Sequence, residues 1–164
     1  KKILAICWGM QVAVTAAGGE VKRGIKGSHI GIANDIELTN DGLNNLLYKD
    51  KKNKFNTPAF NFDEVVTTPK GTIHLASNKI NKIQGLNFKM GTSEIWGLQY
   101  HPEITYKKMV DIIKFRKDAL IEKKNVFKNE KEVNNHINFI EEEIKISEKD
   151  SRMLEIRNWL NLIN

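Results

Sequence analysis

The chain has 164 residues, 40% of them hydrophobic, which is enough for one core, and no apolar run approaches the ~18 to 20 residues that span a bilayer. Its net charge is +6 at pH 7, but the basic residues alternate with acidic ones and form no aromatic-interleaved stripe, so we expect neither a membrane nor a specific nucleic-acid partner. The single cysteine excludes an internal disulfide framework and is typical of a reducing compartment, so we expect a cytoplasmic protein.

The first predicted element is a short buried strand over residues 2–6, followed by a helix over residues 10–17. Cys7 lies on the turn between them, where its sulfur is exposed and the helix N-terminus favours the nucleophilic thiolate. The backbone N–H of Trp8 would point toward an oxyanion on a carbonyl that Cys7 attacks. A lone cysteine is more often a small buried hydrophobic residue, and only a matching partner downstream favours the nucleophile.

Alternating apolar residues predict a middle region rich in strands. We expect strands over residues 20–22, 29–39, 60–67, 72–77, 80–88 and 95–100. A short helix opens at Asn40, with Leu43, Leu46 and Leu47 on its apolar side. Residues 49–57 are polar and are predicted to form a solvated loop.

The strand over residues 95–100 leads to His101, Pro102 and Glu103. In an extended segment, residues i and i+2 project to the same side, so Glu103 can bond one ring nitrogen of His101 while the other faces the thiol. A nucleophile, a base and an orienting carboxylate are the three groups that acyl transfer requires. We therefore predict that Cys7, His101 and Glu103 are catalytic.

Beyond residue 104 the spacing of apolar residues becomes helical. Three amphipathic helices are predicted, over residues 109–120, 133–144 and 154–163. Their apolar stripes most simply pack on the sheet or on one another, and a docking face for a synthetase or for a second copy in a homo-oligomer is the alternative. We expect residues 1–104 to form the core and residues 105–164 to form a helical extension packed on the same domain.

The remaining polar residues predict neither a metal site nor a cofactor. His29, His74 and His136 fall in different elements, with no cysteine or carboxylate at ligand spacing. The early glycines do not form the G-x-x-x-x-G-K-[ST] phosphate-binding loop. We therefore expect no bound metal, no ATP site and no cofactor.

Three separated segments of the chain resemble the class I glutamine amidotransferase family. The family's nucleophile turn, G-x-C-x-G-x-Q, is matched at Cys7, Gly9 and Gln11, with Ala5 where the family usually has glycine. The later family motif, G-x-Q-x-H-P-E, is complete over residues 97–103.

A third segment is similar to the family's H-x-D-x-V…P-x-G…A-x-S stretch. It contains Asp63 and Val65 and continues through residues 69–77, with Asn61 in the place of the usual histidine. The resemblance covers roughly residues 1–104 and points toward the stand-alone or GMP-synthase-like amidotransferases.

The resemblance implies an α/β fold with a doubly wound, flavodoxin-like sheet. It also implies that Cys7 attacks the side-chain amide carbon of glutamine, that His101 protonates the departing ammonia, and that water hydrolyses the resulting thioester. Glu103 would hold the imidazole, and Gln11 matches a family position that lines the glutamine pocket. In the family, the ammonia passes to a synthetase, and we find no such domain on this chain.

Family members carry several strands and helices before the nucleophile strand, whereas this sequence begins on that strand. We therefore expect a C-terminal fragment that lacks the first strands and the loop supplying a second oxyanion donor. Two other functions stay open. One is a hydrolase on the same scaffold that cleaves γ-glutamyl or other amides and feeds no acceptor. The other is a non-catalytic, truncated relative that acts through protein contacts.

Overall fold

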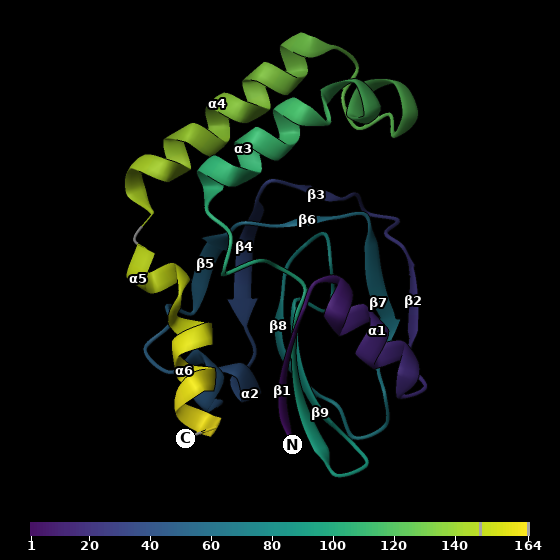
Figure 1. Cartoon of the computed structure of the whole chain (residues 1–164), viewed down its shortest axis with the longest axis vertical. Coiled ribbons are helices and arrows are strands. Elements are labelled where there is room, and N and C mark those ends of the chain that lie inside the picture. Colours follow the sequence, from purple (N-terminus) through teal and green to yellow (C-terminus); the bar gives the residue numbers. More distant parts are fainter. Residues whose placement is uncertain (148, 164) are drawn as a thin grey trace.

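The fold is built on a six-stranded mixed sheet. The computed structural model describes residues 1–147 and 149–163 (Figure 1). The strand order is β1-β10-β9-β8-β4-β5, in which β1 and β10 are parallel and the other pairs are antiparallel. The strands are β1 (Lys2–Ile6), β4 (Ala33–Leu38), β5 (Lys54–Thr57), β8 (Ile73–Ser77), β9 (Gly85–Met90) and β10 (Ser93–Leu98). The predicted α/β class is confirmed, and the sheet of this chain is mixed.

Two short antiparallel ribbons stand beside the sheet. β2 (Glu20–Arg23) pairs with β7 (Asp63–Thr67), and β3 (His29–Ile30) pairs with β6 (Phe60–Asn61). Helix α1 (Trp8–Ala16) contacts β1 and β10 on one side and β2 and β7 on the other (Figure 1). The first helix therefore lies between the main sheet and the β2–β7 ribbon, with one side exposed.

Close packing of α1 on β10 depends on a glycine. Met10 and Val14 of α1 are fully buried, and Met10 lies directly over Gly97. A Cβ atom at Gly97 would lie 2.5 Å from Met10 Cγ and 2.8 Å from Leu86 Cδ1. A glycine at this position therefore lets the helix that follows Cys7 lie against the strand that leads to His101.

The strand predicted over residues 29–39 is broken into β3 and β4 at Gly31. This residue has φ +85°, and a Cβ there would lie 2.7 Å from both Ile113 Cδ1 and Ile140 Cδ1. The backbone therefore turns where two helices approach it, and the alternating sequence alone did not reveal that contact.

Other predicted boundaries also change. Residues 54–57, predicted as loop, form the edge strand β5, because the inward Phe55 and Thr57 are buried and their neighbours are exposed. The strand predicted over residues 60–67 is divided between β6 and β7, and the one predicted from residue 80 begins at Gly85. The short helix is divided into α2 (Asn40–Leu43) and the 3₁₀ turn η1 (Leu46–Tyr48).

Of the three leucines predicted for the apolar side of that helix, Leu47 is buried, whereas Leu43 and Leu46 are exposed. The Thr39 side chain caps α2 by accepting a hydrogen bond from the Gly42 N–H. The segment is therefore anchored by its cap and by one leucine instead of by a continuous apolar face.

The C-terminal region is helical, with α3 (Tyr106–Phe115), η2 (Ala119–Lys123), α4 (Glu130–Ile146), α5 (Lys149–Arg152) and α6 (Leu154–Ile163). The helix predicted over residues 109–120 ends at Phe115, and a separate π-helical turn follows it. Helices α3 and α4 pack against each other above one end of the sheet, and α6 packs against η1 (Figure 1). Ile30 and Ile32 join buried residues of α3 and α4 in one apolar cluster.

A buried ion pair fastens α6 to the core. Glu155 is fully buried and contacts Lys51 Nζ at 3.0 Å, and the Tyr100 hydroxyl donates to its other oxygen at 2.7 Å. Burial lowers the pKa of Lys51, and the charge of Glu155 opposes that shift. Tyr100 follows β10, so this cluster joins the last helix to the segment that carries His101.

Glu155→Ala should lower the free energy of unfolding by about 3 kcal/mol or more, because it leaves a buried ammonium group without its carboxylate. Urea denaturation measures this change. Glu20→Ala is the control, since it removes the carboxylate of an exposed pair with Lys22 and should cost less than about 1 kcal/mol. Equal losses in the two variants would contradict the role given to the buried pair.

Candidate active site

Cys7 occupies a strained turn between β1 and α1. Its φ and ψ are 51° and −109°, a conformation that non-glycine residues rarely adopt. Its backbone N–H donates to the Leu98 carbonyl at 2.6 Å, which fixes it to the end of β10, and its side chain is partly exposed. The turn thus presents a thiol at the end of the parallel strand pair.

His101 lies close by, in a turn after β10. Its backbone N–H donates to the Pro58 carbonyl at 2.7 Å, and its Nδ1 lies 2.6 Å from Glu103 Oε1. The Ile104 N–H bonds back to the His101 carbonyl at 3.2 Å, so the segment is a turn and not extended. The predicted contact between Glu103 and His101 is therefore present. It is formed by a turn and not, as we predicted, by the alternation of side chains along a strand.

The electrostatics of His101 link it to both neighbours. Burial alone would lower its pKa, but hydrogen bonds to Cys7 and Glu103 and the charges of the two groups raise it to about 9. Glu103 occupies Nδ1, which leaves Nε2 as the ring nitrogen available to the thiol. The structure thus brings Cys7, His101 and Glu103 together in one row.

Two glutamine side chains and the Phe60 carbonyl also lie near the thiol, the carbonyl at 3.9 Å from Cys7 Sγ. Gln11 Nε2 donates to the Asp63 carbonyl and to Gln99 Oε1, both at 3.1 Å. Gln99 is fully buried, and its Nε2 lies 3.7 Å from Cys7 Sγ. Sequence reasoning assigned Gln11 to the substrate pocket but gave Gln99 no role, although Gln99 belongs to the same motif as His101.

Trp8 begins α1, so the helix offers its backbone N–H no intrahelical acceptor. The Trp8 residue is 74% exposed. It borders a shallow hollow along α1 with an apolar wall formed by Trp8, Val12, Ala16 and Val21. An apolar surface therefore lies along α1 and begins at Trp8, the residue that follows Cys7.

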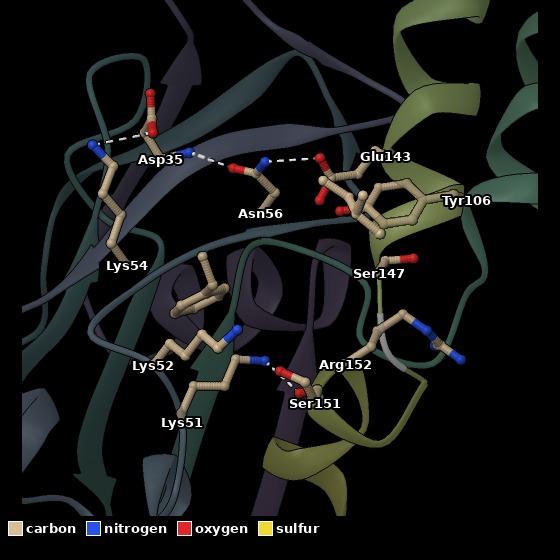
Figure 2. A pocket seen from close by; sticks show the side chains of 12 residues that line it. Asp35, Lys51, Lys52, Lys54, Asn56, Tyr106, Glu143, Ser147, Ser151 and Arg152 are labelled. Atoms are coloured by element: carbon tan, nitrogen blue, oxygen red, sulfur yellow. Dashed lines mark hydrogen bonds and ion pairs between the residues drawn. The ribbon is translucent and has the colours of Figure 1, made fainter.

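A second hollow, of about 420 Å³, lies between β5 and the helices α3 to α5, away from Cys7. Figure 2 shows Lys51, Lys52, Tyr106, Glu143 and Arg152 around it. Its relation to the site is indirect and runs through one side chain.

That side chain is Arg152, which sequence reasoning missed because it lies far along the chain in α5 and has no local signal. Its guanidinium donates to the carbonyls of Pro102 and Ile104, the two residues that flank Glu103. The C-terminal helices are therefore tied to the turn that holds the carboxylate.

The other histidines have partners of their own. His29 lies among amide side chains, His74 contacts the Ala76 carbonyl and His136 contacts the Ile30 carbonyl. In the part of the chain that the structure describes, no group of three or more histidine, cysteine or acidic side chains could hold a metal ion. Within the same residues, no helix is both long and apolar enough to cross a membrane.

The sequence profile described as glutamine amidotransferase class-I matches residues 1–117. This chain belongs to that family. A γ-glutamyl-L-1-hydroxyisopropylamide hydrolase from Pseudomonas sp is 31% identical over 182 residues, covering 97% of this chain and 60% of that protein. One subunit of the glutamine-hydrolyzing GMP synthase of Methanosarcina acetivorans is 36% identical over 109 residues, covering 66% of this chain and 54% of that protein. This class I amidotransferase chain therefore spans little more than half the length of these relatives.

Among solved structures, a glutamine amidotransferase from Thermotoga maritima is similar in fold. Its TM-score is 0.68 at 23% identity, over 98% of this chain and 61% of that one. The similarity includes nearly the whole amidotransferase chain, so the C-terminal helices are part of the shared architecture.

The pKa of His101 offers a direct test of the row Cys7–His101–Glu103. We expect NMR titration to show the imidazole losing its proton near pH 9. Because this pKa is raised in the folded state, the protonated imidazole contributes fully to the stability of the fold below about pH 6.5, and this contribution is lost as the pH rises through about 9. Glu103→Gln should move this titration to lower pH, because a neutral amide replaces the charge. Glu142→Gln, which alters an exposed carboxylate of α4, is the control and should leave it unchanged.

Proposed function

We propose that this protein hydrolyses the side-chain amide of glutamine through a thioester on Cys7. The observation that supports this most directly is the contact of His101 Nδ1 with the Glu103 carboxylate at 2.6 Å, together with the influence of the neighbouring Cys7 on the pKa of the same imidazole. This arrangement combines a nucleophile with a proton carrier whose orientation is fixed.

In the first step, the Cys7 sulfur attacks the amide carbon of the substrate, and the carbonyl becomes a tetrahedral oxyanion. The N–H of Trp8, at the start of α1, is the donor that we assign to this oxyanion. When the C–N bond breaks, protonated His101 gives its proton to the leaving nitrogen. Ammonia departs and a γ-glutamyl thioester remains.

In the second step, water attacks the thioester. Neutral His101 takes a proton from the water, and Glu103 stabilises the imidazolium that forms. The C–S bond then breaks, which releases glutamate and returns the thiolate and the imidazolium to their first state. No metal or cofactor is needed to balance either step.

Gln11 is the residue that we assign to substrate binding. Its amide nitrogen is held by the Asp63 carbonyl and by Gln99, which fixes the side chain beside the thiol. Gln99 in turn reaches the sulfur. A glutamine substrate would therefore meet a preorganised polar wall next to the nucleophile.

We also propose that the ammonia passes to a synthetase that is not part of this chain. The two proteins would act together in the cytoplasm. The similarity to the Methanosarcina acetivorans protein, which is named as one subunit of a GMP synthase, supports this assignment.

A second candidate function is hydrolysis of γ-glutamyl amides with a larger amine, with no ammonia acceptor. Two observations favour it. The named γ-glutamyl amide hydrolase from Pseudomonas sp aligns with 97% of this chain, including most of its C-terminal helices. In addition, the exposed indole of Trp8 offers an apolar surface for a leaving group bulkier than ammonia.

Cys7→Ser should lower amide hydrolysis by at least about 10³-fold, because an alcohol is a far weaker nucleophile than a thiolate. Glu103→Ala should keep part of the activity, since His101 can still carry the proton from a less favourable orientation. Ammonia or glutamate release measures both variants. A fully active Cys7→Ser protein would rule out the thioester.

The two candidate functions are distinguished by comparing kcat/KM for glutamine with kcat/KM for a γ-glutamyl N-alkylamide. A glutaminase should prefer glutamine, whereas the second candidate should prefer the alkylamide and lose about 10-fold for that substrate in Trp8→Ala. The control is the same variant assayed with glutamine, for which the indole has no leaving group to contact. If neither amide is cleaved and a glutamine-analogue electrophile leaves Cys7 unlabelled, the result supports the non-catalytic alternative, in which the protein acts only through contacts with other proteins.

A further inference from the structure

A buried polar network lies behind the proposed substrate wall, and His29 is at its centre. His29 is 2% exposed and stands directly opposite Asn61 in the β3–β6 pair. Its Nδ1 lies 3.0 Å from Asn61 Oδ1. Both residues are enclosed among further amide side chains, so each polar atom needs a partner with the right donor or acceptor character.

The direction of the hydrogen bonds follows from Glu64. Its carboxylate can only accept, so Asn81 Nδ2 donates to it at 3.0 Å. Asn81 Oδ1 is then an acceptor, and Asn61 Nδ2 donates to it at 3.2 Å. The remaining atom, Asn61 Oδ1, must accept, which means that His29 Nδ1 carries a proton.

The other ring nitrogen is constrained just as strictly. Asn78 Oδ1 accepts from the backbone N–H groups of Ile80 and Asn81, so Asn78 Nδ2 faces His29 Nε2, at 3.0 Å. Gln84 Nε2 also faces this nitrogen, at 3.3 Å. Because the orientation of Asn78 is fixed by its two backbone contacts, Nε2 must accept from Asn78 Nδ2, and a second proton on the ring would point at that donor.

Burial acts in the same direction, since desolvation lowers the pKa of His29 to about 4, although its neighbours partly oppose the shift. The imidazole is therefore neutral, with its single proton on Nδ1. A neutral ring in one fixed tautomer is suited to hold a neighbour in place and is not suited to carry protons.

The network ends at the proposed substrate wall. Asn61 Nδ2 donates not only to Asn81 but also to the Asp63 carbonyl, at 3.0 Å. The same carbonyl accepts from Gln11 Nε2. The position of the Gln11 amide thus depends on a carbonyl that Asn61 holds, and the orientation of Asn61 depends on His29.

We infer that His29 is a positioning residue for substrate binding, acting through Asn61 and the Asp63 carbonyl on Gln11. This inference rests on the proposed amide hydrolysis at Cys7. It also explains the departure at Asn61, where the family usually has histidine: in this chain an imidazole stands directly across the strand pair and orients the amide that replaces it.

The test is a double-mutant cycle assayed by glutamine hydrolysis. His29→Asn should raise KM about 10-fold and change kcat less than about 3-fold, because it loosens binding and leaves the reacting groups in place. Asn61→Ala should do the same. If His29 acts through Asn61, the double variant should be no worse than Asn61→Ala alone. An unchanged KM in His29→Asn, or effects that multiply in the double variant, would overturn the inference.

Two controls separate positioning from general damage. His74→Asn alters another strand histidine, bonded to the Ala76 carbonyl outside this network, and should leave KM unchanged. Alkylation of Cys7 by iodoacetamide needs no substrate pocket and should proceed at the parental rate in His29→Asn. If the wild-type protein cleaves no amide, both the proposed function and this inference are contradicted. If the wild type is active and the KM of His29→Asn is unchanged, only the inference is contradicted.

NMR of histidine ring nitrogens provides a second measurement that needs no variant and so does not depend on whether His29→Asn folds. We expect His29 to be neutral and protonated at Nδ1 at pH 6, and its ring signals to shift when glutamate saturates the site. The His74 signals should not shift. An Nε2-protonated or charged His29 ring would contradict the hydrogen-bond directions on which the inference depends.

Discussion

The parallel pairing of β1 with β10 is the contact on which the site depends. The pair brings Ile6 opposite Leu98, and the next bond, from the Cys7 N–H to the Leu98 carbonyl, joins the two chain segments where they diverge. One segment continues into α1 and the other into the turn at His101. A shift of one residue in the register of β1 and β10 would turn the β10 side chains to the opposite face of the sheet and separate the thiol from the imidazole. The buried faces of the two strands set this register, so they determine the geometry of the site as well as the fold.

Backbone groups hold the rest of the site. The N–H of Gln99 donates to the Gln84 carbonyl, that of His101 donates to the Pro58 carbonyl, and Arg152 binds the carbonyls on either side of Glu103. Each of these contacts joins an element distant in sequence to the segment after β10. The positions of the imidazole and the carboxylate are therefore set by several elements, and not by the local sequence alone.

Local sequence predicted those parts of the site that local chemistry determines. The strand, turn and helix around Cys7 follow from apolar spacing and a glycine, and the structure has them. The meeting of His101 and Glu103 was expected from strand alternation, but a turn produces it. The sequence excludes His29 as a metal ligand but gives no sign of its amide partners, because these come from strands and loops far apart in the sequence and approach it only when β3 and β6 are paired. The sequence does not predict β5, because its two inward residues, Phe55 and Thr57, alternate with polar residues in a segment rich in lysine and asparagine.

The most direct test of the proposed chemistry is to capture the covalent intermediate. Because Cys7 is the only cysteine in the chain, a γ-glutamyl group on sulfur can be located without ambiguity. Rapid acid quenching during turnover of a γ-glutamyl amide, followed by peptide mass spectrometry, should find one glutamyl group on the peptide that contains Cys7. Hydroxylamine should remove that group. Amide turnover with an unmodified Cys7 at every quench time, or a glutamyl group on a different residue, would contradict the thioester mechanism.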